Sequence, residues 1–465
     1  LGSGGRRDGM KDKNLNMARK IAACVAQKGG RTFFVGGCVR DKIAGIENKD
    51  IDIEIHGVSP ETLADILDHL GKRTEMGASF GIFGLRGYDL DIAMPRKEEA
   101  TGRGHKDFDI YVDPWLGTKK AAMRRDFTMN ALMEDVLTGE VLDHFGGIRD
   151  LKAKVLRHVN DETFTEDPLR VLRAAQFAAR FEFTVAPETI ALAKTMDLTA
   201  LARERVFEEL KKALQKAEKP SIFFEEMRKM EQLSFWFPQV QRLIGVMQDP
   251  VFHPEGDVWI HTMLVLDQAA KIKEKAQNRV GFMLAALTHD FGKILTTKEA
   301  DGRIRSLGHE TEGLPLIRAF LGRLTNERSL IKYVLNMDQL HMQPNMMFYQ
   351  KAGKTATNRM FDRCVDPAGL LLLARADHLG RKDAPPYDEI EAFLQSRLEY
   401  FTGIMEKPYV MGADLVQAGL KPGPDFSDYL AFAHKLRLAG VEKEQALAQT
   451  LAYARKKERD GKNEC

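Results

Sequence analysis

Residues 35–57, VGGCVRDKIAGIENKDIDIEIHG, decide the fold of the first part of this chain. They follow the residues RTFF, which are typical of a short buried strand, so that Gly36 and Gly37 form a turn at its end. A missing Cβ at such a turn lets backbone amides approach phosphate oxygens closely. Arg40, one helical turn later, can present its planar guanidinium to the same phosphates.

The same stretch continues into a strand that carries two aspartates. Asp50 and Asp52 are two residues apart in KDIDIEIHG, so both carboxylates point to one face of the predicted strand. Two such carboxylates can hold one or two Mg²⁺ ions, which clamp a triphosphate and activate an attacking hydroxyl. Either fragment alone is more often a plain turn or an exposed strand face. Their combination within one short stretch indicates nucleotidyl transfer.

Composition sets the broad class of the chain. Of its 465 residues 44% are hydrophobic, and 69 Lys and Arg against 67 Asp and Glu leave a net charge of +2. These values exclude a disordered polyelectrolyte, and the length predicts two to four domains rather than one core. The near-zero charge alone argues against a nucleic-acid partner. Whole-chain charge averages over domains, however, and the arginines of the motifs are expected around one cleft.

Cysteine usage and hydropathy predict a cytoplasmic protein without membrane association. The four cysteines are scattered, which disfavours a disulfide framework, and no apolar run approaches the roughly 20 residues of a spanning helix. Residues 1–14 begin with a Gly, Ser and Arg bias and are expected to be a leader or an expression remnant.

The pattern of elements predicts an α+β chain with a mixed head and a helical remainder. Strand and helix signals alternate over residues 15–155, where FGIFGLRGYDLDIAMP (80–95) indicates a strand pair. Strand signals nearly vanish beyond that point. We expect a helical neck over 156–220, a helical body over 221–400 and a helical tail over 401–465.

Several motifs resemble one known family. Residues 35–57 look like the nucleotidyltransferase signature of the class II CCA-adding tRNA nucleotidyltransferase and bacterial poly(A) polymerase family. MRRDFTMNAL (123–132) is similar to its second motif, and DIAMPRKEEATGRGHKDFDIYVDPWL (91–116) to its flexible segment. TEDPLRVLRAAQFAARFEF (165–183) resembles its EDxxR nucleotide-reading helix, and RERVFEELKKAL (203–214) the next helix. The resemblance implies a polymerase-β-like mixed-sheet head on a helical neck and body.

The resemblance also implies roles for the head residues. Asp50 and Asp52 would hold Mg²⁺ and act in catalysis, while Arg125 would contact the nucleotide and Asp126 and Asn130 its sugar. Asp91 would be a third catalytic carboxylate or a positioning residue. Arg124 would be structural or would contact a tRNA phosphate.

The EDxxR helix would read the incoming base. Asp167 and Arg170 would hydrogen-bond the Watson–Crick edge of CTP or ATP, Glu166 would orient the arginine, and Arg173 would reach the triphosphate. Helical spacing predicts that Glu166, Arg170, Arg173 and Arg180 form one charged stripe, with Asp167 pairing with Arg170. An isolated helix with this pattern could equally be a solvated, ion-paired face. The opposite side carries Leu169, Leu172, Ala175 and Ala179.

A second candidate site lies in the helical body. His261, His289 with Asp290 in THDFGK, and Asp377 in ARADHLGR follow the pattern of the HD metal-dependent phosphohydrolase superfamily. Such ligands converge from separate helices on one divalent ion, which lowers the pKa of bound water. The sequence leaves the identity of this metal open. His309 and His341 could complete a second metal site or contact substrate phosphate, and Lys293 could bind phosphate.

Chains that join both parts resemble bacterial multifunctional CCA enzymes. The resemblance implies addition of C, C and A to the tRNA 3′ end from CTP and ATP. It also implies phosphatase, 2′-nucleotidase and 2′,3′-cyclic phosphodiesterase activities in the HD domain. The tail, 401–465, would contact the outer part of tRNA, so the expected RNA surface runs from the 3′ end to the acceptor and elbow region. HD-bearing relatives are often oligomers, which makes a homo-oligomer compatible with the resemblance.

Three kinds of alternative stay open at this point. A poly(A) polymerase, or an enzyme that adds only CC or only A, shares the head motifs, although the intact segment 95–108 disfavours a CC-only enzyme and the HD domain disfavours a poly(A) polymerase. An HD phosphohydrolase whose head is an RNA-binding module belongs to a different class, and the intact D-x-D argues against it. A structural RNA chaperone would neither bind nor consume triphosphate.

Overall fold

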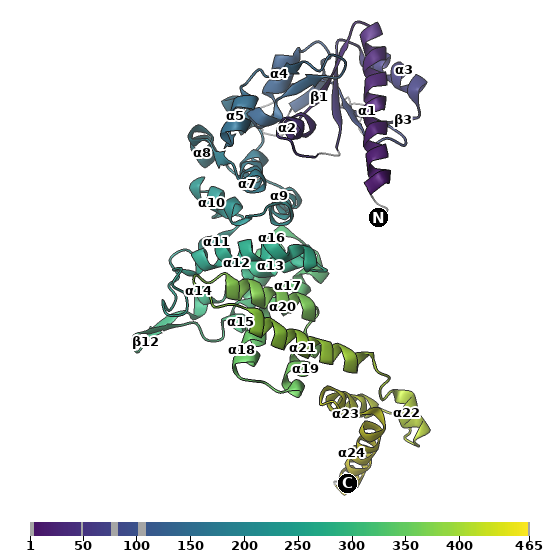
Figure 1. Ribbon diagram of the computed structural model, residues 1–465, viewed down its shortest axis with the longest axis vertical. Helices are drawn as coiled ribbons and strands as arrows, with labels where there is room; N and C mark the ends of the chain where they lie inside the picture. The colour runs from purple at the N-terminus through teal and green to yellow at the C-terminus, as the bar shows by residue number, and fades with distance from the viewer. Residues whose placement is uncertain (1–3, 48–49, 76–81, 101–107, 464–465) are drawn as a thin grey trace. The chain divides into compact units, whose positions relative to one another are not determined.

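The computed structural model describes residues 4–47, 50–75, 82–100 and 108–463. The chain divides into two compact units, one of Leu1–Leu210 with Ile222–Gln232, the other of Lys211–Ser221 with Leu233–Cys465 (Figure 1). The first unit holds the mixed sheet and the second is almost wholly helical. The predicted α+β class, a mixed-sheet head followed by helices, is confirmed. The finer four-part division stays a prediction.

A seven-stranded mixed sheet forms the centre of the first unit. Strand β2 (Asp52–His56) lies in its middle, antiparallel to β1 (Arg31–Val35) and parallel to β5 (Asp91–Ala93). The strand pair expected within residues 80–95 is present as β4 (Ile82–Leu85) and β5. The sheet order is β3-β4-β5-β2-β1-β8-β9, with β3 at Arg73–Glu75, β8 at Met133–Asp135 and β9 at Val141–Leu142.

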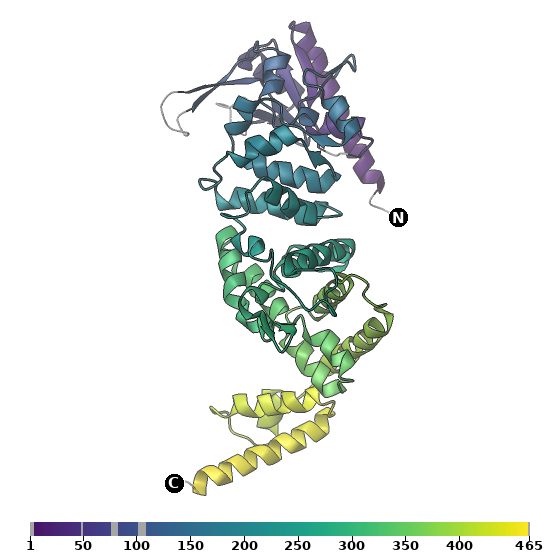
Figure 2. The same cartoon turned by 90° about the vertical axis from the view of Figure 1, so that its left-hand side faces the viewer.

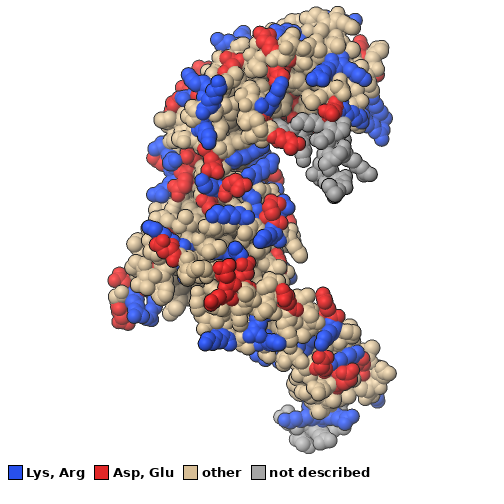
Figure 3. Space-filling model, viewed as in Figure 1, with Lys and Arg blue, Asp and Glu red and all other residues tan. Residues whose placement is uncertain are grey.

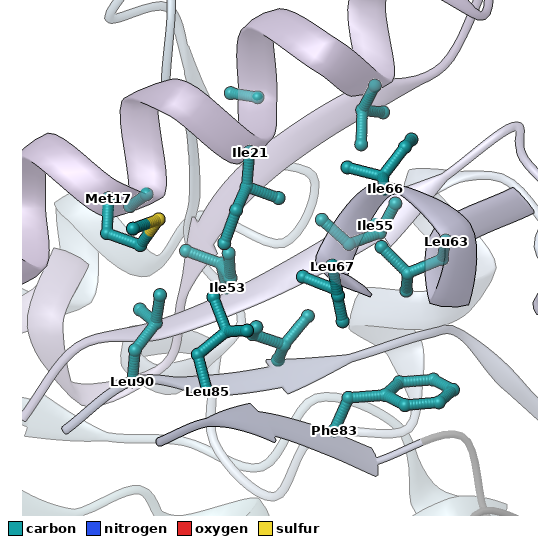
Figure 4. Close-up of a cluster of buried hydrophobic side chains, with 14 of the residues drawn as sticks. Met17, Ile21, Ile53, Ile55, Leu63, Ile66, Leu67, Phe83, Leu85 and Leu90 are labelled. Carbon is teal, nitrogen blue, oxygen red and sulfur yellow. The ribbon is translucent and has the colours of Figure 1, made fainter. Parts of the chain in front are cut away.

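Two helices cover one face of this sheet and form its main core with it. Helix α1 (Gly4–Gln27) packs against β1 and α3 (Pro60–Leu70). In Figure 4, Ile53 and Ile55 of β2 point toward Ile21 of α1 and Leu67 of α3. Because neighbouring residues of a strand face opposite sides, burying these isoleucines directs Asp52, Glu54 and His56 to the other face.

Helix α1 extends further toward the N-terminus than the sequence predicts. It begins at Gly4, within the residues 1–14 that were expected to lie outside the fold as a leader. Asn14, the last of these residues, belongs to the fold, because its side chain is buried and its Oδ1 accepts a hydrogen bond of 3.3 Å from the backbone amide of Asp89.

The opposite face of the sheet is covered by short elements around a smaller cluster that contains Phe33, Val35 and Met133. Strands β6 (Arg96–Ala100) and β7 (Phe108–Val112) pair as a separate hairpin, and residues 101–107 of the expected flexible segment lie outside the described residues. The short elements on this side are α2 (Gly37–Ile43), α4 (Thr118–Met123), the 3₁₀ turn Thr128–Asn130 and α5 (Gly147–Ala153).

The helix of the EDxxR motif is shorter than its motif suggests. Helix α7 spans Leu169–Phe181, so Glu166 precedes it instead of lying on its charged stripe, and Asp167 precedes it as well. Pro168 explains the break, because proline disfavours helical geometry in the preceding residue and lacks an amide hydrogen. The apolar side is buried as expected. Around α7 lie α6 (Asp161–Thr165), α8 (Pro187–Lys194), α9 (Arg203–Lys216), α10 (Ser221–Lys229) and the paired short strands β10 (Val155–Leu156) and β11 (Thr184–Val185).

The second unit is built on four packed helices. Helix α12 (Val258–Ile272) packs against α13 (Arg279–Thr288) and α20 (Pro367–Leu379), and α13 also packs against α17 (Arg328–Leu340). Around them lie α11 (Pro238–Gln241), the 3₁₀ turn Lys273–Lys275, α14 (Lys293–Thr296), α15 (His309–Glu312), α16 (Leu314–Leu324), α18 (Gln343–Tyr349), α19 (Lys354–Arg363), α21 (Asp388–Glu406) and the hairpin of β12 (Lys298–Ala300) and β13 (Arg303–Arg305).

The last helices of the second unit form a small cluster of their own. Helices α22 (Gly412–Gln417), α23 (Phe426–Leu438) and α24 (Lys443–Asn463) share a core that contains Leu415, Tyr429 and Ala446. The yellow helices α23 and α24 lie side by side (Figure 2). Phe432 and Tyr453 stack between them with ring centroids 4.4 Å apart.

The surface carries both charge signs. Lys and Arg are mixed with Asp and Glu over the face shown in Figure 3. In the described ranges, no helix combines the length and the apolar character needed to cross a membrane.

Leu67→Ala tests the core that positions β2. Leu67 is 0% exposed, so we expect a loss of about 2–5 kcal/mol in the unfolding free energy of the head. Leu137→Ala, at a side chain that is 52% exposed, should cost less than about 0.5 kcal/mol. Native-state amide hydrogen exchange of β1 and β2 measures the unfolding free energy of both variants. Equal protection in Leu67→Ala and Leu137→Ala would contradict the burial of Leu67 in the core.

Candidate active sites

Three carboxylates of the head lie close together where strands β2 and β5 begin. Asp52 opens β2, Asp91 opens β5 directly beside it in parallel register, and Asp50 precedes β2 by two residues. Burial and the neighbouring charges of Asp91 and Asp50 raise the pKa of Asp52, although Arg125 acts in the opposite direction. A carboxylate whose pKa is raised by neighbouring carboxylates belongs to a cluster that a cation would stabilise. The carboxylate oxygens are also the donors that Mg²⁺ prefers.

The glycine turn lies against an arginine of the second motif. Gly36 has φ 69°, a left-handed conformation that favours glycine, and a Cβ built there would lie 3.4 Å from Arg125 Nη1. Arg125 Nη2 in turn lies 3.3 Å from Glu54 Oε2. The turn, Arg125 and the acidic strand are therefore assembled in one place.

Glu54 is a residue that the sequence reasoning missed. Its Oε1 lies 2.8 Å from His56 Nε2, and its other oxygen holds Arg125. Burial would raise the pKa of Glu54, but the hydrogen bond from His56 and the charge of Arg125 outweigh it and lower the pKa. The signal was present, because Glu54 and His56 continue the alternation that begins at Asp50.

Arg40 occupies a different environment from the predicted one. We expected its guanidinium to face phosphates, but Arg40 is only 4% exposed. Its Nε and Nη2 each lie 2.7 Å from Asp41 Oδ1, its Nη1 donates to Asn130 Oδ1 at 2.7 Å, and it lies over the Phe181 ring. Arg40 is thus a buried support for Asn130, because its donors are already engaged inside the protein.

Asp126 is the centre of a buried polar network. Its Oδ1 accepts from Asn130 Nδ2 at 2.9 Å, and its Oδ2 accepts from Arg173 Nε at 2.7 Å. Burial would raise the pKa of Asp126, but the charge of Arg173 and the hydrogen bond from Asn130 lower it. The structure thus joins Asp126, Asn130 and Arg173, which were all predicted to bind the nucleotide, in one hydrogen-bonded network.

Asp167, just before α7, has a different ion-pair partner from the predicted one. Asp167 was expected to pair with Arg170, but its Oδ2 accepts from Arg205 Nη2 of α9 at 2.8 Å. Arg170 donates to the backbone oxygens of Thr163 and, at 2.7 Å, of Arg124. Arg205 belongs to the quoted motif RERVFEELKKAL, but spacing within one helix could not predict a contact between two helices.

The second site brings together all four residues of the HD pattern. His261 lies on α12, His289 and Asp290 directly follow α13, and Asp377 lies on α20. His261 Nε2 is 3.0 Å from Asp377 Oδ1 and 3.6 Å from Asp290 Oδ2, and His289 Nε2 is 3.3 Å from Asp290 Oδ2. His261, His289 and Asp290 are buried. These ligand types, drawn from the ends of separate helices, have the arrangement that a divalent ion needs.

The chemistry of these atoms fits a metal ion. Nε2 of His289 is buried and has no hydrogen-bond partner among the described residues, while its Nδ1 lies 3.0 Å from the carbonyl oxygen of Ala286. A carbonyl oxygen can only accept, so the proton lies on Nδ1 and Nε2 offers its lone pair to the site. A buried, unpaired lone pair beside two carboxylates is a ligand position rather than a core contact.

A second group of candidate ligands shares Asp290. Asp290 Oδ1 lies 3.3 Å from His309 Nε2, which lies 3.3 Å from His341 Nε2, and Lys293 Nζ lies 2.8 Å from Asp290 Oδ2. Gly292 allows this approach, because a Cβ built there would lie within 1.9 Å of the His309 carbonyl oxygen. The structure therefore places His309, His341 and Lys293 at the same centre as the HD residues.

Glu255 and His253 are further residues that the sequence reasoning did not assign. Glu255 Oε1 lies 2.9 Å from His261 Nδ1 and 2.8 Å from His253 Nδ1. A carboxylate on Nδ1 orients the ring and leaves Nε2 for a ligand. The segment FHPEGDVWIH precedes the HD pair in the sequence, but only the folded chain shows which of its side chains reach His261.

A cavity of about 650 Å³ opens onto this centre. Asp290, Asp377 and His309 lie in its wall, and four cations line it as well, Lys293, Arg303, Arg305 and Arg381. Two aromatic side chains that line it, Phe252 and Tyr349, are 63% and 61% exposed. The cavity has room for a small organic phosphate beside the candidate ligands.

Comparisons with known proteins match both parts of the chain that carry these candidate sites. Residues 32–157 match the family described as the Poly A polymerase head domain, residues 182–244 the family described as a probable RNA and SrmB-binding site of polymerase A, and residues 258–381 the HD domain. The multifunctional CCA protein of Cupriavidus metallidurans is 34% identical over 440 residues, which are 90% of this chain and 100% of the relative. That of Nitrosospira multiformis is 39% identical over 67% of this chain and 73% of the relative.

The chain belongs to the multifunctional CCA protein family. The family predicted from the motifs is therefore confirmed. Solved structures show the same fold at lower identity. The CCA-adding enzyme of Bacillus stearothermophilus in complex with CTP is 19% identical with a TM-score of 0.66, and the alignment covers 96% of this chain and 99% of that chain. The Thermotoga maritima CCA-adding enzyme complexed with tRNA is 22% identical with a TM-score of 0.63, covering 95% of this chain and 96% of that chain.

Glu54→Gln tests whether the carboxylate positions Arg125. The amide keeps the size of the side chain but removes the charge that holds the guanidinium, so we expect the Kd for CTP and ATP to rise by about tenfold. Isothermal titration calorimetry measures this change. Glu140→Gln is the matched control, since Glu140 pairs with the exposed Arg31 elsewhere in the head. Unchanged nucleotide affinity in Glu54→Gln would show that Arg125 holds its place without this pair.

Proposed function

We propose that this chain adds C, C and A to the 3′ end of tRNA from CTP and ATP, and that its HD domain is a metal-dependent phosphohydrolase. The observation that carries the proposal is the cluster of Asp50, Asp52 and Asp91 at one sheet edge beside Arg125, in a chain of the multifunctional CCA protein family. The predicted CCA-adding function agrees with the names of its relatives.

In the head, Asp50 and Asp52 hold Mg²⁺ and Asp91 supports Asp52 from the neighbouring strand. The bound ion supplies charge for the triphosphate and a route to an activated 3′-hydroxyl. The attack of that hydroxyl on the α-phosphate forms a phosphodiester and releases pyrophosphate. Gly36 and Gly37 allow close approach of the phosphates, and Arg125 neutralises their charge.

Base selection rests on the residues around the start of α7. Asp167 and Arg170 bind the Watson–Crick edge of cytosine or adenine, and Glu166 orients the arginine. Because Asp167 holds Arg205 in the structure, nucleotide binding exchanges that ion pair for bonds to the base. The exchange is energetically easy, since the pair is partly exposed to solvent. Arg173, Asp126 and Asn130 contact the triphosphate and the sugar.

In the HD domain, His261, His289, Asp290 and Asp377 hold a divalent ion. That ion lowers the pKa of bound water and so supplies a nucleophile for phosphoester hydrolysis. His309 and His341 hold a second ion together with Asp290, or contact substrate phosphate directly. Lys293 contributes positive charge at the phosphate, and the substrates include 2′-nucleotides and 2′,3′-cyclic phosphates.

The RNA partner is tRNA, in keeping with the tRNA complex of the Thermotoga maritima relative. The match of residues 182–244 to a probable RNA-binding family supports an RNA surface on the neck. We assign the tail over 401–465 to the acceptor and elbow region. A homo-oligomer, and residence in the cytoplasm, stay predictions from the sequence.

Extension of tRNA transcripts tests the nucleotidyl-transfer activity. Transcripts that end before CCA, after C or after CC are incubated with CTP, ATP or both, and the products are resolved on a gel. We expect two C residues from CTP alone on the first transcript and a single A on the last. Repeated incorporation of ATP into RNA that does not end in CC would favour a poly(A) polymerase, and failure to incorporate CTP would overturn the proposal.

Two substitutions test whether the sites are separate. Asp52→Ala should lower nucleotide addition by about a thousandfold, because it removes a metal-binding carboxylate, and should spare hydrolysis of 2′,3′-cyclic AMP. His289→Ala should do the reverse. Loss of both activities in either variant, with the fold intact by circular dichroism, would contradict the assignment of two independent sites.

A further inference from the structure

Arg381 lies in the wall of the HD cavity, just beyond the end of α20. It lines the cavity together with the candidate ligands Asp290 and Asp377. No motif in the sequence singles it out beyond the final letter of ARADHLGR, and none of the roles proposed above uses it. Its surroundings are unusual for an arginine beside a candidate metal centre.

The guanidinium of Arg381 is held by a neutral partner. Its Nη2 lies 2.5 Å from His378 Nδ1, and its Nε lies 3.4 Å from the His378 backbone oxygen. Within the described part of the chain, no carboxylate oxygen lies within 4.0 Å of its nitrogens. Most cations in partly buried positions have a carboxylate partner, so an anion that enters the cavity would supply the missing counter-charge.

His378 is fixed so that it can hold the arginine. It is 1% exposed, and its Nε2 lies 2.8 Å from the carbonyl oxygen of Pro385. A carbonyl only accepts, so the proton lies on Nε2 and the lone pair of Nδ1 faces Arg381. The Tyr387 ring packs against His378 with centroids 5.0 Å apart, and its hydroxyl donates to Asn345 in the cavity wall at 2.8 Å.

The other cations of the cavity are placed differently. Lys293 Nζ is 2.8 Å from Asp290 Oδ2 and donates to Gln248 Oε1 at 2.8 Å, so its charge is already partnered at the centre. Arg303 and Arg305 are exposed side chains of the β13 strand. Arg381 differs from the other three because it is half-buried, is oriented by the buried His378 and has no carboxylate oxygen within 4.0 Å among the described residues.

We propose that Arg381 binds a phosphoryl oxygen of the substrate in the HD cavity and that His378 is the positioning residue that orients its guanidinium. This inference rests on the proposed phosphohydrolase function. The ligand is a phosphate ester of a nucleoside, because a planar guanidinium matches two phosphoryl oxygens and the exposed rings of Phe252 and Tyr349 offer stacking surfaces to a base.

Steady-state hydrolysis by the full chain tests the role of Arg381. With 2′,3′-cyclic AMP as substrate and saturating divalent metal, Arg381→Ala should raise KM by about tenfold to a hundredfold while kcat changes by less than about threefold, since its charged hydrogen bond holds the substrate in ground and transition state alike. Inhibition by inorganic phosphate should weaken to a similar degree. Lys382→Ala is the matched control, a neighbouring cation whose side chain does not line the cavity.

Variants of His378 test the positioning role. Asn at this position can still offer an oxygen to Arg381, whereas Leu cannot. We expect His378→Leu to raise KM as Arg381→Ala does, and His378→Asn to restore most of the affinity. If His378 acts through Arg381, the double variant Arg381→Ala/His378→Leu should have a KM less than about twofold above that of Arg381→Ala alone. Two controls show that each variant is intact: the rate of CCA addition by the head and the amount of metal bound per chain, both of which should match the wild type.

The outcomes separate this inference from the function on which it rests. If the wild-type chain does not hydrolyse the substrate with any divalent metal, the proposed phosphohydrolase function fails. If the wild type is active but Arg381→Ala keeps the KM and phosphate inhibition of the wild type, the role of Arg381 is wrong. A drop in bound metal in Arg381→Ala, or a larger effect on kcat than on KM, would also overturn it. Equal KM in His378→Leu and wild type would reject the positioning role alone.

Discussion

The alternation of β2 is the constraint on which the head depends. Ile53 and Ile55 are 0% exposed in the core against α1 and α3, and every second residue between and beside them is polar. A slip of one residue in the register would turn Asp52 and Glu54 into this apolar core and take the isoleucines out of it, which burial of apolar surface strongly opposes. The same force that stabilises the sheet therefore presents the carboxylates, and the parallel pairing with β5 adds Asp91.

The HD centre depends on a different constraint, the burial of charge. Asp290 is 2% exposed, and an unpaired carboxylate in that position would be costly. Lys293, His289 and His309 surround it, and the charge of Lys293 and the hydrogen bond from His309 hold the pKa of Asp290 well below its usual range despite its burial. Asp290 therefore remains ionised at the meeting point of two groups of candidate ligands. Its neighbour Gly292 lets α15 approach closely enough to place His309 there.

Predictions from the sequence were most accurate where a local pattern governs the outcome. The strands around residues 31–57, the apolar side of α7 and the helical body follow from periodicity, and the structure places them as expected. Arg40 shows where this reasoning stops. Its spacing from Gly36 suggested a phosphate contact, but the rings of Phe177 and Phe181 and the amide of Asn130 come from distant parts of the chain and enclose it. Asp167 likewise pairs with Arg205 on a different helix.

The sequence by itself determined the chemistry of both sites, because residue types and their short-range spacing set which donors each segment can offer. It determined that carboxylates alternate with isoleucines and that a His–Asp pair ends an apolar helix. Only the tertiary structure decided which of these groups meet. The hydrogen bond from Arg125 to Glu54 joins distant segments, Glu255 reaches His261 through the irregular chain that leads into α12, and His378 orients Arg381 because Pro385 and Tyr387 fix its ring. No local periodicity encodes these contacts.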